Sequence, residues 1–80
     1  MDDLLERHRS TSNYYLRLRA AVTAGETDVA WAGIDHLAKP RTLRNARLAR
    51  SLRVLMHELG PPPERWQLTA RRVGAAARAR

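Results

Sequence analysis

Residues 41–59, with the sequence RTLRNARLARSLRVLMHEL, decide how this chain folds. Leucines at positions 48, 52, 55 and 59 recur at the spacing of one helix face and lie within about 60° of one another around the axis. Arginines recur at every third position from 41 to 53, and because each step falls about 60° short of a full turn, they wind around the helix. We therefore expect one helix over 41–59 that buries its leucines and presents Arg47, Arg50 and Arg53 on the opposite side.

The length and composition restrict the class of protein. Eighty residues form one small domain, and a chain of this size buries only about 60% of its unfolded surface, so a homodimer would add stability. There is no cysteine, which excludes disulfides and thiolate metal sites. No apolar run is long enough to span a membrane, and the acidic start at Asp2 and Asp3 is unlike a signal peptide. We expect a cytoplasmic protein, located in the host cytoplasm or the virion if a phage encodes it.

The charge is distributed unevenly along the chain. Residues 1–38 contain four arginines and six acids, a net charge of −2, whereas residues 39–80 contain eleven basic residues and two acids, a net charge of +9. A basic half of this kind is typical of a protein that meets an anionic surface.

Three further helices are expected, at 2–24, 28–38 and 63–78. The polar run at 10–13 either continues the first helix or breaks it and caps a new one near Tyr14, and both alternatives stay open. The segment 28–38 is apolar nearly all round, which is typical of a buried central helix, and Gly33 would allow a neighbouring helix to cross closely. Three prolines at 61–63 form the corner before the last helix.

These patterns predict an all-α fold, a compact bundle of three to four helices in a single domain spanning 1–80. The basic tail, 71–80, has few apolar side chains and is expected to fray unless a partner holds it. The residues expected in the core are Leu18, Val22, Trp31, Ile34, Leu37, Leu48, Leu52, Leu55, Leu59 and Trp66.

The basic half supports a hypothesis of nucleic-acid binding, with DNA preferred to RNA, through phosphate contacts that release counterions. The alternative for the same arginines is a solvated face paired with acids of the first helix. The specific form of the hypothesis is a small regulator or accessory factor from a phage or mobile element. The Arg- and Ala-rich composition resembles that of small helical proteins of actinobacteria and their phages or plasmids, and this resemblance implies no functional residues. The candidate residues for binding nucleic acid or an acidic partner are Arg41, Arg44, Arg47, Arg50, Arg53, Arg71 and Arg72.

A protein–protein interaction or assembly module is the second hypothesis. Leu43 and Val54 lie among the arginines on the expected outer face, and arginine mixed with apolar residues is typical of protein interfaces. Trp66 is expected either in the core or as the anchor of a homodimer. A phage structural component, or an inhibitor that docks on an acidic host protein, would belong to this class.

More specific activities have little support in the sequence. A helix-turn-helix fits only in outline, because the turn at 39–41 lacks glycine and the helix after it is too long. His57 and Glu58 begin a zinc-protease motif, but position 61 is proline where the second histidine belongs. No nucleophile motif or phosphate-binding loop is present, so we expect no enzyme, metal or cofactor. Tyr14 and Tyr15 would suit base stacking, although on a helix seam they are more typical of a core.

Overall fold

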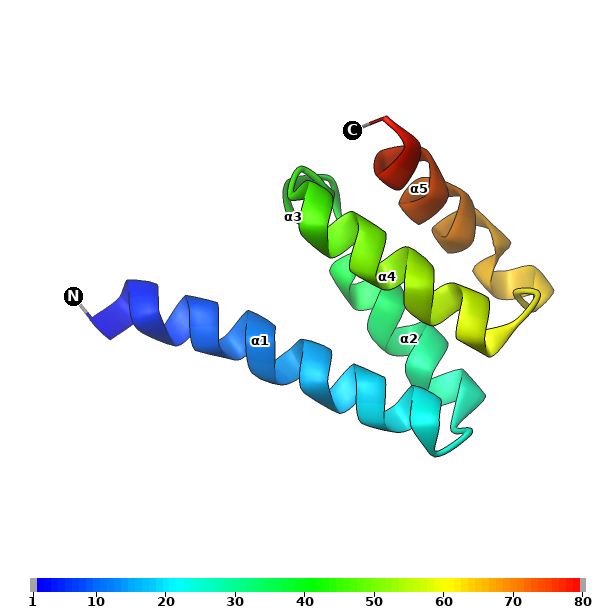
Figure 1. The fold of residues 1–80 in the computed structure, drawn as a ribbon, viewed down its shortest axis with the longest axis horizontal. Coiled ribbons are helices and arrows are strands. Elements are labelled where there is room, and N and C mark those ends of the chain that lie inside the picture. The colour runs from blue at the N-terminus through cyan, green and yellow to red at the C-terminus, as the bar shows by residue number, and fades with distance from the viewer. Residues whose placement is uncertain (1, 80) are drawn as a thin grey trace.

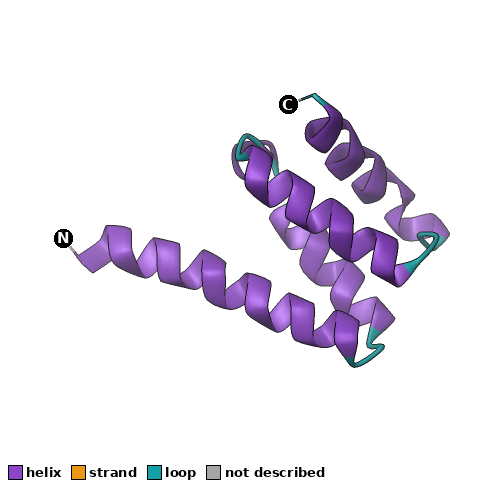
Figure 2. Ribbon diagram, viewed as in Figure 1, coloured by secondary structure: helices purple, strands orange, loops and turns teal. Residues whose placement is uncertain are grey.

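The computed structural model describes the backbone of residues 2–79 and the side chains of residues 13–79. Within this part of the chain the structure is helical and contains no strand, which confirms the expected all-α bundle (Figures 1 and 2). The elements are α1 (Asp2–Thr23), α2 (Thr27–Leu37), α3 (Pro40–Leu43), α4 (Ala46–Leu59), a 3-10 turn η1 (Glu64–Trp66) and α5 (Gln67–Arg78).

Helix α1 is continuous through residues 10–13, so the unbroken alternative is the one found. The second half of α1 packs against α2, whereas the first half extends beyond the other helices (Figure 1). α1 ends at Thr23, and Gly25, two residues further on, has a φ of 76° in the left-handed region. The N–H groups of Gly25 and Glu26 donate to the carbonyls of Val22 and Ala21, and this pattern is the Schellman motif that satisfies the last carbonyls of a helix.

Helix α2 is the centre of the molecule. Ala30, Trp31 and Ile34 are completely buried, as the apolar pattern predicts. α1 crosses α2 at Gly33, where an added Cβ would lie only 2.9 Å from Leu18 Cδ1. The expectation that Gly33 permits a close crossing is therefore confirmed. The two helices approach so closely that a side chain at position 33 would have no room.

The single helix predicted over 41–59 is wrong in one respect, because the segment forms two helices. α3 has only four residues, and Asn45 begins a separate helix. The Asn45 side chain takes an N-cap role, since its Oδ1 accepts a hydrogen bond of 3.2 Å from the Leu48 N–H. This cap satisfies a donor that would otherwise be unpaired at the start of α4 and stabilises the change in direction.

Helices α4 and α5 form the most extensive helix pair and run antiparallel, side by side (Figure 1). Gly60, with a φ of 85°, ends α4, and the proline corner leads through η1 into α5. On its inner side α5 is tied to α2, because the buried Thr69 hydroxyl donates a 2.6 Å hydrogen bond to Asp35 Oδ1.

Most of the predicted core is confirmed. Six of the predicted residues are buried, namely Leu18, Trp31, Ile34, Leu37, Leu52 and Leu55. The other four, Val22, Leu48, Leu59 and Trp66, are partly buried and pack against the core. Beyond those ten residues, the core also contains the fully buried Val73 and the small residues Ala21, Ala30, Ala38, Ala49 and Ala77.

Candidate anion-binding surface

Helix α4 separates charge from apolar contact around its circumference. Leu52 and Leu55 are buried on its inner side. Arg47, Arg50 and Arg53 are all exposed, as the periodicity predicts. The leucines stabilise the bundle, and the guanidinium groups are left at the surface.

The other arginines of the predicted site lie in different places. Arg41 belongs to α3 and Arg44 to the turn before Asn45, so neither extends the row of arginines along α4, although both are exposed. Arg71 and Arg72 are also exposed, but consecutive residues of a helix point about 100° apart. The candidate site is therefore divided, rather than the single surface that the sequence suggested.

The two flanks of α5 show this division. Arg71 lines a hollow near the proline corner, together with Arg78, which lies seven residues further along the same face. Arg72 lines a different hollow, against Pro40 and Leu43. Arg78 lines the same groove as Arg53 of α4, and it was not among the predicted site residues. Its spacing of seven residues from Arg71 could have indicated that the two lie on the same face of a helix.

These arginines have little internal neutralisation. Among the side chains of residues 13–79, the one ion pair within 4 Å joins Arg65 to Asp28 at 3.7 Å, and both side chains are largely exposed. None of the α4 arginines pairs with a carboxylate of that part of the chain. The acidic positions near the start of α1 lie outside the described side chains, on the half of the helix that extends away from α4 and α5 (Figure 1).

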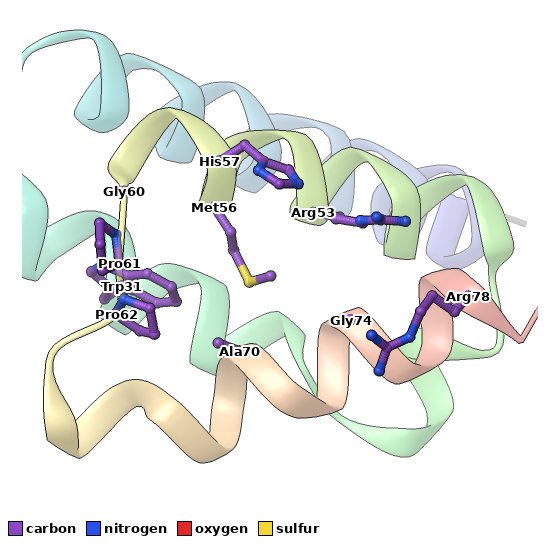
Figure 3. Close-up of a pocket in the computed structure, with 10 residues that line it drawn as sticks. All are labelled: Trp31, Arg53, Met56, His57, Gly60, Pro61, Pro62, Ala70, Gly74 and Arg78. Carbon is purple, nitrogen blue, oxygen red and sulfur yellow. The ribbon is translucent and has the colours of Figure 1, made fainter.

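A groove lies between α4, the proline corner and α5, and we call it the α4/α5 groove. It has a volume of about 500 Å³. Figure 3 shows Met56 pointing from α4 into the space towards α5, with Arg53 and Arg78 at one end and the prolines at the other. The lining residues are Trp31, Arg53, Met56, His57, Gly60, Pro61, Pro62, Ala70, Gly74 and Arg78.

The predicted protein-interface residues behave differently from one another. Val54 is 57% exposed, on the same outer side of α4 as the arginines. Leu43 was expected on that outer face but is partly buried and packs against the core, because α3 turns it inward. Trp66 also packs against the core, with the Arg65 guanidinium carbon 5.0 Å from the centre of its ring.

Tyr14, Tyr15, His36 and His57, the tyrosines and histidines whose side chains are described, show no arrangement typical of a catalytic or metal site. Tyr14 stacks on His36, with ring centroids 4.9 Å apart and an angle of 25° between the planes. Tyr14 and Tyr15 are both partly buried against the core. Among the described residues, no group of three or more potential ligands could hold a metal ion. Of the described helices, none combines the length and the apolar character needed to cross a membrane.

Comparison with family models, with curated proteins and with solved structures finds no match to this chain.

Proposed function

We propose that this protein binds nucleic acid, without catalysing a reaction on it, through the cationic side of α4 and α5. One observation carries the proposal: Arg47, Arg50 and Arg53 are exposed along one helix and are not paired with any carboxylate of residues 13–79. Arg78 of the neighbouring helix lines the same groove as Arg53 and adds charge to this side, and Arg71 lines the adjoining hollow.

The spacing of the arginines suits a phosphate backbone. Arg47 and Arg53 are six residues apart, a rise of about 9 Å along the helix. The same length of duplex DNA carries about five phosphate charges. The phosphates along this length therefore outnumber the three arginines, and arginine–phosphate contacts position a protein on the duplex without specifying a sequence.

DNA is the preferred target in this proposal because the major groove of B-form DNA admits an α-helix, whereas the major groove of A-form RNA is deep and narrow. Recognition of a base sequence through a helix-turn-helix is not part of the proposal. The four-residue α3 stands between α2 and α4, and it lengthens the connection beyond the short turn of that motif. A general DNA-associating accessory factor, or a regulator that borrows its specificity from a partner, fits this interface better.

Charge reversal tests the proposal. Fluorescence anisotropy with a labelled 20-base-pair duplex at low salt should give saturable binding, and the double variant Arg50→Glu/Arg53→Glu should abolish it. The control, Arg17→Glu/Arg19→Glu, makes the same change in net charge at exposed positions of α1 and should retain most of the binding. Equal loss in the two variants would show a net-charge effect only and would contradict a defined interface.

Exposure of Val54 favours a second candidate, a protein partner with an acidic surface or a second copy of the chain. An apolar side chain that is 57% exposed among arginines has the composition of an interface rather than of a solvated face. Val54→Asp should then disrupt the complex or the dimer, as measured by light scattering, while DNA binding is absent in all variants.

A further inference from the structure

The floor of the α4/α5 groove is apolar and adaptable. Met56 projects into it from α4, and Pro61 and Pro62 close one end (Figure 3). Trp31, which is completely buried, forms the back of that end. Methionine has an unbranched, polarisable side chain that adjusts to different apolar groups, and it is common on surfaces that bind varied peptides.

The α5 side of the groove consists of small residues, which keep it open. Ala70 and Gly74 line it, and an added Cβ at Gly74 would have no atom within 4 Å. Glycine inside a helix costs about 1 kcal/mol relative to alanine. Unlike Gly33, Gly74 is not required by a helix crossing, so the free space beside it is open to a ligand.

The rim of the groove is cationic. Arg53 and Arg78 line it, and the adjoining hollow, which shares Gly74 and Arg78, adds Arg71. Among the side chains of residues 13–79, none of those that line either space is acidic. An apolar floor beneath guanidinium groups is complementary to a ligand with an apolar group and carboxylates on either side.

An acidic peptide fits these features better than an inserted nucleobase does. Proteins that bind unpaired bases stack them on exposed aromatic rings. Among the described residues that line the groove, Trp31 is the one tryptophan, tyrosine or phenylalanine, and it is completely buried. A volume of about 500 Å³ lies within the usual range for ligand sites and is large enough for one apolar side chain with its adjacent backbone.

We infer that the α4/α5 groove is a docking site for a peptide segment that carries one large apolar residue between aspartates or glutamates. The apolar side chain lies against Met56 and the proline corner, and the carboxylates pair with Arg53 and Arg78. The site does not include Arg47 or Arg50 of the proposed DNA-binding surface, but it shares Arg53 and Arg78 with that surface.

Nuclear magnetic resonance with the ¹⁵N-labelled full chain tests this site. The probes are capped pentapeptides with two acidic residues on each side of a central Leu, Ile, Met, Phe or Trp. At least one should shift the amide signals of Met56, Ala70 and Gly74 saturably, with a Kd of about 1 mM or lower. Peptides with glycine at the centre, or with the acids replaced by Asn and Gln, should bind about tenfold more weakly.

The variant Gly74→Leu distinguishes the contribution of the open groove to peptide binding from the contribution of the arginine charges. It fills the open space, removes a helix-interior glycine and leaves every arginine in place, so the fold should be retained. Peptide binding should fall by at least about tenfold, while DNA affinity stays unchanged. The control Ala75→Leu places the same side chain one residue further on, at the opposite flank of α5, and should leave peptide binding intact.

Arg78→Gln is a second variant, and its interpretation does not depend on whether the fold tolerates leucine at position 74. Arg78 is exposed near the end of α5, so its replacement should not affect the fold. This substitution should weaken the binding of the acidic peptides and leave the binding of the Asn/Gln peptides unchanged. The inference is overturned if no probe shifts the groove amides at millimolar concentration, if acidic and amide peptides bind equally, or if Gly74→Leu binds as the unmodified protein does. Because peptide and DNA are titrated separately, failure of one proposal is distinguishable from failure of the other.

Discussion

Helices α2 and α4 contact the same core, but they differ in what they present to solvent. In α2, Trp31 and Ile34 are completely buried, and the helix carries neither arginine nor lysine. In α4, one side is as deeply buried, whereas the other presents Arg47, Arg50 and Arg53. The comparison teaches that apolar side chains of both helices maintain the fold, while the exposed arginines of the proposed binding surface lie on α4 and its neighbour α5.

Truncation of Trp31 is the test of this difference for which we expect the largest change in stability. Trp31→Ala removes a completely buried ring from α2, and such a change costs about 3–5 kcal/mol. A domain of this size has a total stability of about 4–12 kcal/mol. We therefore expect the variant to lose most or all of its cooperative unfolding transition when urea denaturation is monitored by circular dichroism. On α4, Val54→Ala at an exposed position should change stability by less than about 0.5 kcal/mol. Similar losses for the two variants would contradict the difference between the helices.

Two glycines give a smaller test of the same kind. Gly33→Ala in α2 brings a Cβ within 2.9 Å of Leu18 Cδ1, and overpacking there should cost about 1 kcal/mol net of the gain in helix propensity. Gly74→Ala in α5 meets open space and should stabilise the protein by about 0.5–1 kcal/mol. Thermal unfolding of both variants should therefore show shifts of opposite sign. An increase in Tm for Gly33→Ala would show that the crossing of α1 and α2 is looser than described.

The N-cap of α4 gives an effect of about 1 kcal/mol. Asn45→Ala removes the acceptor for the Leu48 N–H and should reduce the free energy of unfolding by that amount. Asn13→Ala, at an exposed position inside α1, is the control and should not destabilise, because alanine has the higher helix propensity. If Asn45→Ala were neutral, the division of residues 41–59 into α3 and α4 would lose its physical explanation.

The buried faces of the helices could be predicted because the spacing of apolar residues along a helix indicates which face is buried. The leucine spacing of α4 and the apolar composition of α2 were both visible in the sequence. The break at Asn45 was not predicted, because the arginine spacing continues across it without change. A capping side chain decides that boundary through one local hydrogen bond, which a periodic pattern does not report.

The candidate site was less predictable, because it depends on how helices pack. Arg71 and Arg72 are adjacent in sequence, yet they lie on opposite flanks of α5. Arg53 and Arg78 are 25 positions apart and line one groove, because α5 runs antiparallel to α4. Helical spacing predicts which side of one helix a residue occupies, but the neighbour that it faces follows from tertiary packing.

The salt dependence of DNA binding by arginine-to-glutamine variants tests the central claim most directly. For the unmodified protein, the logarithm of the association constant should fall linearly with the logarithm of the salt concentration, with a slope of about −0.9 for each phosphate contact. Arg50→Gln/Arg53→Gln should reduce the magnitude of that slope by about 1.8, while the free energy of unfolding changes by less than about 1 kcal/mol. An unchanged slope in this variant, or a slope near zero in the unmodified protein, would contradict the claim that the exposed arginines of α4 bind phosphates.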